Sequence, residues 1–273
     1  MVHLSSHGPV VRAEFATART RLIGITVSCY AYRGVVIDTA FPDARQEYRD
    51  WLGDLRPDGV VVTHQHEDHA GNVNSVAKLG LPLWMGEETA AAVRDVQPIG
   101  YYRQFTWKTM RSLTRAVTPF EPGPVEMLHT PGHSSDHHVA WASEDRILFA
   151  GDLFLGVKVR VAHPHENPRQ LVESLRRMAA LEPRMMFCAH RGLVADPIAT
   201  LTAKADWLES TIGEVDRLLD AGWADAAIRR AVLGREDVAG YISFGDYSRT
   251  NFVTAIRGSR VLAGALEPER KEA

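Results

Sequence analysis

Hydrophobic and polar residues alternate over the first part of the chain in a pattern that predicts strands mixed with helices. Residues 22–32 are rich in strand-forming side chains, and Arg33-Gly34 marks a turn before the strand-like stretch 35–38, which predicts an antiparallel hairpin. Apolar residues recur at helical spacing over 44–55, and the short continuous apolar run 59–62 indicates a buried strand. The same pattern places further strands at 81–84, 125–129, 139–141, 147–150 and 184–189, and helices at 72–79, at 87–95 and from Pro168 onward.

The last part of the chain shows only helical patterns. Residues 201–219 form a long amphipathic pattern, followed by a shorter one over 224–233 and another over 249–263. Strands mixed with helices and then helices alone predict an α/β body with a C-terminal helical appendage. We expect the body to span residues 1–195 and the appendage to span 196–273, where it can act as a lid. His3 and His7 are expected in an exposed N-terminal tail.

The stretch 63–72, which reads THQHEDHAGN, directly follows the predicted strand 59–62. Residues two apart in extended backbone point to the same side, so His64 and His66 can converge on one metal ion. Asp68 and His69 lie where the chain turns into the next helix and face elsewhere, which suits a second ion. The alternative is a polar loop in which Asp68 caps that helix, but capping leaves the three histidines unexplained. We therefore interpret the stretch as a metal site for zinc, iron or manganese.

Composition narrows the class of protein. The 273 residues are 45% hydrophobic and 24% charged, as in ordinary globular proteins, and are enough for a large core. The formal net charge of -3 argues against a dedicated nucleic-acid binder. Neither a secretory signal at the start nor a membrane-spanning apolar run is expected. Cys29 and Cys188 lie in apolar strand-like surroundings, which favours two buried thiols and a cytoplasmic protein, and a homodimer is left open.

Three more polar residues follow predicted strands: His133, Asp152 and His190. With the four from the 63–72 stretch they make seven candidate ligands, and two ions sharing one carboxylate and one water would use all of them. Here the sequence resembles the metallo-β-lactamase-fold hydrolases over roughly residues 20–195. Asp38, at the end of an early strand, also fits that family. The matching motifs are THQHEDHAGN at 63–72, TPGHSSDH at 130–137, AGD at 150–152 and AHRG at 189–192.

The resemblance implies a fold and an assignment of ligands. The fold is a four-layer αββα sandwich, two mixed sheets face to face with helices outside, and the cofactor is a pair of divalent metal ions, Zn²⁺ before Fe or Mn. Many members read Gly-His-Gly where this chain has AHRG, so Arg191 is a departure close to a ligand. His137 is expected to support the ligands without binding metal. By the resemblance, the first ion is held by His64, His66 and His133, the second by Asp68, His69 and His190, and both by Asp152.

The resemblance also narrows the reaction. True β-lactamases of this fold lack the carboxylate at the position of Asp152, whereas glyoxalase II-like thioesterases, lactonases and phosphodiesterases keep it. We therefore expect a dinuclear metal-dependent hydrolase that uses metal-bound hydroxide on a thioester, ester or lactone. Asp68 is the expected proton acceptor as well as a ligand. The G-x-S-x-G signature of a serine nucleophile is absent from the sequence, which agrees with this mechanism.

The segment 98–119 interleaves aromatic and basic residues and is the predicted substrate-binding flap. Residues 94–115 hold five basic residues against one acidic residue, which suits a small-molecule substrate with an anionic group. The alternative is a surface helix whose aromatic side chains pack inward. His163 and His165 lie in a loop that can reach the site, without an assigned role. The candidate substrate contacts are Tyr102, Arg103, Trp107, Arg111 and Arg191, with Arg229, Arg230, Tyr241, Phe244, Tyr247 and Arg249 as further candidates in the C-terminal helices.

Three other functions stay open from the sequence alone. One is a phosphodiesterase or ribonuclease of the same fold, for which strong salt dependence of RNA binding is the discriminating observation. Another is a sulfur dioxygenase-like enzyme with one iron per chain, which metal analysis distinguishes. The third is a metal-retaining ligand-binding protein that hydrolyses little.

Overall fold

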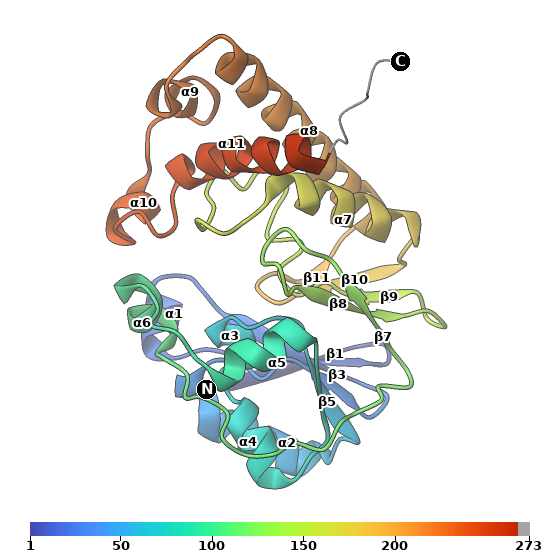
Figure 1. Cartoon of the computed structure of the whole chain (residues 1–273). Helices are drawn as coiled ribbons and strands as arrows, with labels where there is room; N and C mark the ends of the chain where they lie inside the picture. Colours follow the sequence, from blue (N-terminus) through green and yellow to red (C-terminus); the bar gives the residue numbers. More distant parts are fainter. Residues whose placement is uncertain (267–273) are drawn as a thin grey trace.

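The computed structural model describes residues 1–266 and shows two mixed sheets packed face to face, with helices on both outer faces (Figure 1). This is the αββα sandwich that the family resemblance of the sequence implies. The first sheet has six strands, antiparallel from β1 to β4 and parallel from β4 to β6. Its strands, in spatial order, are β1 (Val2–His7), β2 (Val10–Phe15), β3 (Val27–Tyr32), β4 (Val35–Ile37), β5 (Gly59–Val62) and β6 (Leu83–Met85).

The second sheet comes from the later part of the chain. Its five strands lie in the order β11 (Gly192–Val194), β10 (Met185–Cys188), β9 (Ile147–Phe149), β8 (His138–Ala142) and β7 (Glu126–His129). The helices of the first half are α1 (Ala18–Leu22), α2 (Arg45–Leu55), α3 (Glu67–Ala70), α4 (Val73–Leu79), α5 (Glu87–Arg94) and α6 (Tyr101–Trp107), with a 3₁₀ turn at Pro42–Ala44. Those of the second half are α7 (Pro168–Ala180), α8 (Pro197–Asp220), α9 (Asp225–Val232), α10 (Val238–Ile242) and α11 (Arg249–Leu266).

Aromatic side chains fill the space between the two sheets. Phe149 and Phe187 of the second sheet stack with ring centroids 5.6 Å apart, and Tyr30 of the first sheet lies 5.1 Å from the Phe187 ring. The Tyr30 hydroxyl is also buried and donates a hydrogen bond to the Cys188 carbonyl (2.6 Å). This bond satisfies the polar end of a ring that is otherwise surrounded by apolar atoms. The acceptor residue, Cys188, is the last residue of β10, the strand that precedes His190. The hydrogen bond therefore connects the core between the sheets to the loop that bears His190.

Two further hydrophobic clusters cover the outer faces. One joins the first sheet to α2, α4 and the segment after α6 through residues such as Trp51, Val76 and Leu113. The other joins the second sheet to α7, α8, α9 and α11. The C-terminal helices thus pack on the α/β body through α7. The division of the chain between 1–195 and 196–273 stays a prediction, and residues 267–273 lie outside the described residues.

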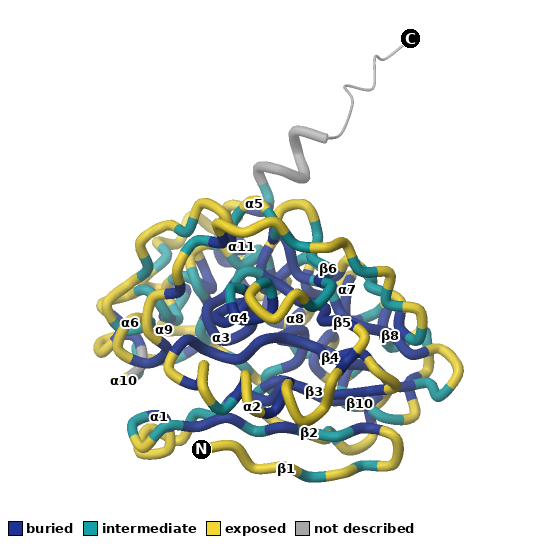
Figure 2. Tube along the Cα trace, turned by 90° about the horizontal axis from the view of Figure 1, so that it is seen from below, coloured by how far each residue is buried: buried dark blue, intermediate teal, exposed yellow. Residues whose placement is uncertain are grey.

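The N-terminal residues form a hairpin that the sequence pattern did not predict. Val2–His7 pairs with Val10–Phe15 along its whole length, so His3 and His7 lie in an edge strand and the expectation of a tail is wrong, although His3 is exposed as expected. Seen from below, β1 is largely exposed at the sheet edge, β2 has both buried and half-buried residues, and β3 is buried (Figure 2). The hydrogen-bond ladder therefore holds β1, and hydrophobic patterning gives little sign of such a strand.

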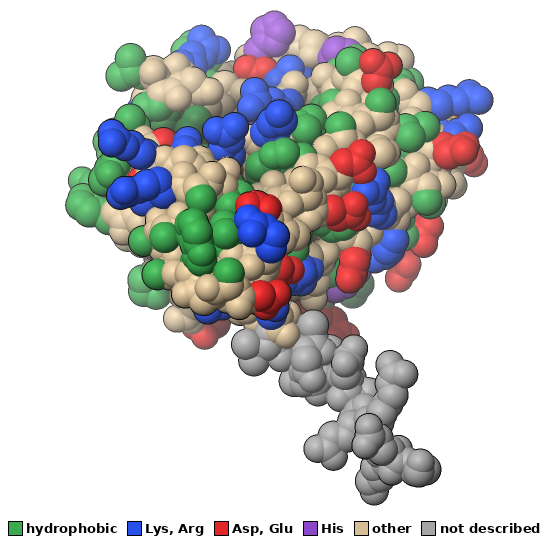
Figure 3. All heavy atoms as spheres, turned by 90° about the horizontal axis from the view of Figure 1, so that it is seen from above, with side chains coloured by type: hydrophobic (Ala, Val, Ile, Leu, Met, Phe, Trp, Pro, Cys, Tyr) green, Lys and Arg blue, Asp and Glu red, His purple; other side chains and the backbone are tan. Residues whose placement is uncertain are grey.

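The C-terminal helices form the face that Figure 3 shows from above, where acidic and basic side chains are interspersed. Several of these form ion pairs, including Arg176 with Glu209 (2.6 Å) and Arg169 with Asp216 (2.7 Å). Among the helices of residues 1–266, none is both long enough and apolar enough to cross a bilayer.

We expect Phe149→Ala to lower the free energy of unfolding by about 3–5 kcal/mol, because it leaves a cavity between the sheets where Phe149 is 1% exposed. Urea unfolding followed by fluorescence measures the change. Phe244→Ala is the matched control, since Phe244 is 83% exposed and its truncation should change stability by less than about 0.5 kcal/mol. Equal effects of the two substitutions would contradict the placement of Phe149 in the core.

Candidate metal centre

The candidate ligands lie in loops that leave the carboxyl ends of strands at one edge of the sandwich. His64 and His66 follow β5, and Asp152 and His190 follow β9 and β10, which are parallel neighbours. β7 runs in the same direction as β9 because each is antiparallel to β8, so the loop with His133 leaves at the same edge. Strand direction thus brings residues far apart in sequence together, as the sequence analysis expected.

One group consists of three imidazoles and a carboxylate. His66 Nδ1 lies 3.0 Å from His64 Nε2 and 3.0 Å from His133 Nε2, and His133 Nε2 lies 3.5 Å from Asp152 Oδ2. All four side chains are buried. Because His66 Nδ1 has only one lone pair or one proton to share, it cannot hydrogen-bond well to both neighbours. Their ligand atoms lie within 4.8 Å of one another, a spacing at which the four residues could hold one ion.

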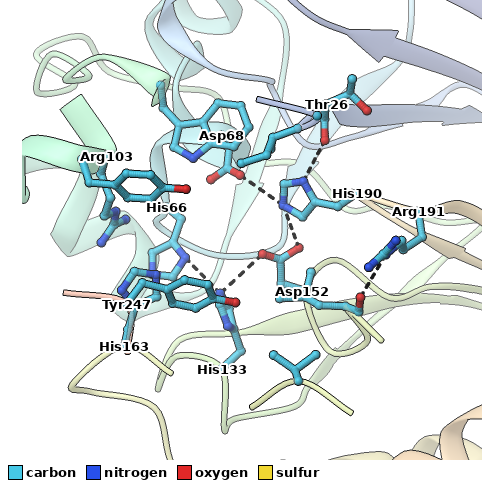
Figure 4. A pocket seen from close by; sticks show the side chains of 16 residues that line it. Thr26, His66, Asp68, Arg103, His133, Asp152, His163, His190, Arg191 and Tyr247 are labelled. Atoms are coloured by element: carbon cyan, nitrogen blue, oxygen red, sulfur yellow. Dashed lines mark hydrogen bonds and ion pairs between the residues drawn. The ribbon is translucent and has the colours of Figure 1, made fainter. Parts of the chain in front are cut away.

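A second group lies on the other side of Asp152. His190 Nε2 is 3.2 Å from Asp68 Oδ2, and both His190 Nε2 and His69 Nε2 are 3.4 Å from Asp152 Oδ1. Asp152 therefore turns one oxygen toward each group, and Figure 4 shows its carboxylate between His133 and His190. The structure brings all seven predicted residues together, and their roles as ligands stay a prediction.

Hydrogen bonds fix the orientation of the second group's histidines. His69 Nδ1 lies 2.8 Å from Asp38 Oδ2, and the same carboxylate accepts a hydrogen bond from the Thr63 backbone N–H (2.8 Å). His190 Nδ1 lies 2.8 Å from the Thr26 carbonyl oxygen. A carboxylate and a carbonyl can only accept, so both Nδ1 atoms carry a proton. Each Nε2 is thereby directed toward Asp152, in the carboxylate–histidine arrangement common around metal ions.

His137 supports the centre from behind. Its Nε2 accepts a hydrogen bond from the Asp152 backbone N–H (3.1 Å), so its Nδ1 carries the proton and donates to Thr130 Oγ1 (2.9 Å). Both ring nitrogens are therefore used, in agreement with the expected supporting role. Gly151 makes this approach possible, because a Cβ at that position would lie 2.8 Å from His137 Nε2.

Burial determines the protonation state of the three histidines in the first group. It lowers the pKa of His64 and of His66 well below the ordinary value of 6.5, and that of His133 to about 3. These imidazoles are therefore neutral at pH 7 and have lone pairs available for a metal ion.

In the second group, neighbouring carboxylates outweigh the effect of burial on the histidine pKa values. Burial acts to lower the pKa of His69 and of His190, but Asp152 and the neighbouring carboxylates outweigh it and raise both well above 6.5. Burial likewise acts to raise the pKa of Asp152, and His190 and His69 hold it well below its usual range. In the metal-free protein, protons on these two histidines thus compensate the buried negative charge.

The chemistry of these donors fits divalent ions. His69 Nε2 and Asp152 Oδ1, which face each other in the second group, are buried and have no hydrogen-bond partner within residues 1–266. Two imidazole nitrogens on one tetrahedral zinc ion lie about 3.3 Å apart, close to the separations in the first group. Unpartnered buried polar atoms are costly, and a bound cation would remove this cost.

A hollow of about 380 Å³ opens onto both groups. Trp107 and Leu155 form part of its apolar wall, and Tyr247 brings a hydroxyl from the C-terminal region. Four of the predicted substrate contacts line it: Tyr102, Arg103, Trp107 and Arg191.

The arginines near the site differ in what they contact. Arg103 Nη2 pairs with the buried Glu67 (2.5 Å), so its charge is already compensated. Arg191 Nε donates to the Leu155 carbonyl (3.0 Å), and its guanidinium forms no ion pair among the described residues. Arg111 lies elsewhere, in a separate hollow beside α2 and α4, and so is not placed to contact a substrate at this centre.

The rest of the 98–119 segment is anchored to the body. Trp107, Met110 and Leu113 are buried in the cluster on the outer face of the first sheet, as the inward-packing alternative expected, whereas Tyr101 and Phe105 are exposed. The role of the segment as a flap stays a prediction. Of the C-terminal candidates, Tyr247 lines the hollow of the site. The others line none of the hollows described at this centre: Arg229, Arg230, Tyr241, Phe244 and Arg249.

His163 and His165 do reach the centre. Their ring centroids lie 6.0 Å and 5.8 Å from that of His66, and the His163 ring packs against Tyr247 at 4.9 Å. They lie beside the first group and extend its wall, with no role assigned by the structure.

Sequence reasoning missed three charged residues near the centre, of which Asp136 and Lys204 are buried and Glu166 is half-buried. Asp136 accepts a hydrogen bond from the Gln65 backbone N–H (2.8 Å) and so ties two of the loops together. Glu166 Oε1 lies 3.7 Å from His133 Nδ1, and burial raises its pKa to about 7. Burial lowers the pKa of Lys204 to about 8. Lys204 was detectable, because it lies among apolar residues on one face of an amphipathic pattern.

Comparison with known proteins places this architecture in a family. A model of the metallo-beta-lactamase superfamily matches residues 24–190. A beta-lactamase-like protein 2 homolog from Drosophila melanogaster is 28% identical over 188 residues, covering 62% of this chain and 58% of that protein. An atrochrysone carboxyl ACP thioesterase from Aspergillus terreus is 27% identical over 213 residues, covering 77% and 58%. A hydroxyacylglutathione hydrolase from Aeromonas salmonicida is 26% identical over 176 residues, covering 62% of each. This chain thus spans about three fifths of the length of these curated relatives.

Solved structures show the same fold. A metallo-beta-lactamase family protein from Thermus thermophilus has a TM-score of 0.63 at 20% identity, covering 88% of this chain and 90% of that chain. A metallo-beta-lactamase from Pontibacter korlensis has a TM-score of 0.59 at 17% identity, covering 77% and 99%. At these identities the likeness concerns the fold alone.

We expect Asp38→Asn to weaken zinc binding at the second group by about 10–100-fold, because an amide cannot both accept from Thr63 and hold His69 as the carboxylate does. Isothermal titration calorimetry, in which zinc is added to the metal-free protein, measures the zinc affinities of the two groups separately. The affinity of the His64, His66 and His133 group should change by less than about threefold. Asp145→Asn, at a surface carboxylate away from the centre, is the control. An equal loss at both groups would contradict a local orienting role for Asp38.

Proposed function

We propose a function for this chain from its family and its site: it belongs to the metallo-beta-lactamase superfamily, and we infer that it is a dinuclear metal-dependent hydrolase of acyl substrates. The observation that carries the proposal is the convergence of seven imidazole and carboxylate side chains, six of them buried and His190 half-buried, with His69 Nε2 and Asp152 Oδ1 unpartnered among residues 1–266. Relatives named as an ACP thioesterase and a hydroxyacylglutathione hydrolase support a thioester, with an ester or lactone as the neighbouring classes.

The proposed ligands follow the two groups around Asp152. Two divalent ions, Zn²⁺ before Fe or Mn, lower the pKa of water and polarise a carbonyl oxygen when bound at such a centre. Asp152 would serve both ions, and its geometry supports this proposal because one oxygen faces each group. The first ion would be held by His64, His66 and His133, and the second by Asp68, His69 and His190.

Asp68 is the proposed proton acceptor. Burial acts to raise its pKa, but His69 and His190 outweigh burial and lower it, so the carboxylate is ionised at neutral pH. It lines the hollow, where it can take the proton that water loses as its oxygen adds to the acyl carbon. When the carbon–sulfur or carbon–oxygen bond breaks, the proton returns to the leaving group. Burial raises the pKa of Tyr247, whose hydroxyl thus stays protonated and can donate to the substrate.

The walls of the hollow support a substrate with an apolar acyl group and an anionic group. Leu155, Val159 and Trp107 offer apolar surface for the acyl chain. Arg191 lies at the same hollow without a carboxylate partner among residues 1–266, and so suits a carboxylate or phosphate on the substrate. Arg103 already pairs with Glu67, so we assign it to the wall of the hollow and not to binding of the substrate's anionic group.

We expect zinc-loaded protein to hydrolyse thioesters, and His66→Ala to lower the rate by about 100-fold or more, which corresponds to about 2.7 kcal/mol in the activation free energy. A panel of one thioester, one lactone and one phosphodiester, assayed on the same preparation, tests the substrate class. His129→Ala is the matched control, because His129 is exposed and lies outside both groups. Cleavage of the phosphodiester alone, or equal rates for wild type and His66→Ala, would overturn the proposal.

We also expect the second ion to be lost on acidification before the first. The pKa values of His69 and His190 are raised in the metal-free protein, so these imidazoles are protonated at pH 6, and binding of an ion must displace up to two protons. The second affinity should therefore fall by up to about 100-fold per pH unit. His133, with a pKa of about 3, stays neutral over this range and its group retains metal. Zinc content after dialysis at pH 8 and at pH 6 should fall from two ions to one, and simultaneous loss of both would contradict the assignment.

A further inference from the structure

A second hollow, of about 410 Å³, lies between α2, α4 and the segment after α6, and basic side chains surround it. α2 and α4 lie side by side on the outer face of the first sheet (Figure 1). The lining described for this hollow has no residue in common with that of the hollow at the metal centre. Five of its lining residues are basic: Arg45, Arg49, Lys78, Arg111 and Arg115.

The charges of this basic hollow are uncompensated. All five basic residues are exposed, and none forms an ion pair or a side-chain hydrogen bond within residues 1–266. The lining as described contains no Asp or Glu. Elsewhere on the surface arginines do find carboxylates, as Arg176 does with Glu209 and Arg257 with Asp225. In a chain of net charge -3, five unpaired cations around one concavity repel one another and attract anions.

The shape of the basic hollow and its other lining residues indicate which class of ligand it fits. The volume falls in the range of small-molecule pockets, and the cations come from two helices and a loop that enclose a concavity rather than from one extended stripe. Asn74, Ser112 and Thr114 add polar groups. The described lining holds no aromatic side chain on which a base could stack, which disfavours single-stranded nucleic acid.

We propose that this basic hollow is an anion site for a small molecule bearing two or more phosphate groups, separate from the metal centre. Arg49, Arg111 and Arg115 bind phosphate oxygens, for which the planar guanidinium is well suited, and Lys78 adds a point charge. Recognition is of the phosphates and not of a base, so a nucleoside triphosphate and inorganic tripolyphosphate should bind with similar affinity.

The test compares two triple variants that remove the same charge. Arg49→Gln/Arg111→Gln/Arg115→Gln removes three cations from the hollow. Arg184→Gln/Arg230→Gln/Arg235→Gln removes three exposed arginines, each without an ion pair in the described chain, from other surfaces. Calorimetry with magnesium-saturated ATP and tripolyphosphate, on zinc-loaded protein, should show at least tenfold weaker binding for the first variant and less than twofold for the second. Metal content is measured before and after each titration, so that chelation of zinc is not counted as binding.

A footprint on Lys78 locates the ligand. Magnesium-saturated ATP should slow acylation of Lys78 at least threefold while leaving Lys108 and Lys158, which lie outside the lining, unchanged. Equal affinity of wild type and both variants, or an unchanged Lys78 rate, would overturn the proposal, because the anion would then bind at the metal centre or nowhere. Tighter binding of a short RNA than of tripolyphosphate, lost in the first variant, would overturn it in favour of a nucleic-acid surface. Neither result depends on hydrolysis, so failure here is distinct from failure of the proposed catalytic function.

Discussion

The structure depends on holding buried charge and unpaired lone pairs at one edge of a rigid sandwich. Five imidazoles and two carboxylates meet there at separations of 3.0–3.9 Å, and six of the seven side chains are buried. Such a cluster is unfavourable by itself, since burial penalises each ionised carboxylate and each protonated imidazole. It persists because the backbone that bears it is fixed on both sides by strands, and because the protons of His69 and His190 compensate the carboxylates.

A layer of polar contacts transmits this rigidity to the ligands. Asp38 holds His69 and the start of the 63–72 loop, Asp136 ties that loop to the one with His133, and His137 holds the backbone of Asp152. Each of these contacts uses a backbone N–H or a ring N–H, so side-chain orientation follows from strand position. The hollow is then bounded by the centre on one side and by α6 and Tyr247 on the other. The candidate ligands and the opposite wall of the hollow therefore come from different parts of the chain.

The sequence predicts local features well and non-local ones poorly. The hairpin around Arg33-Gly34, the strand at 59–62 and the convergence of His64 with His66 follow from periodicity and pleat, and the structure contains them. The strand β1 was missed because backbone pairing holds it with little burial of its side chains. Arg111 was grouped with Arg103 because they share a basic segment, yet the chain turns between them and delivers them to different hollows. The contacts of Asp136 and Glu166 depend on loops meeting across the fold, which no local pattern records.

The division of the site between the two sheets has a consequence for biogenesis. During synthesis the first sheet, with His64, His66, Asp68 and His69, leaves the ribosome before His190 is made, but a domain generally folds as a unit, so the site is completed only when both sheets are present. The early half offers an incomplete set of donors to any ion, and closure of the second sheet supplies the rest. Under the proposed assignment of ligands, an ion bound at the completed site would hold residues of both sheets and favour the assembled state by mass action.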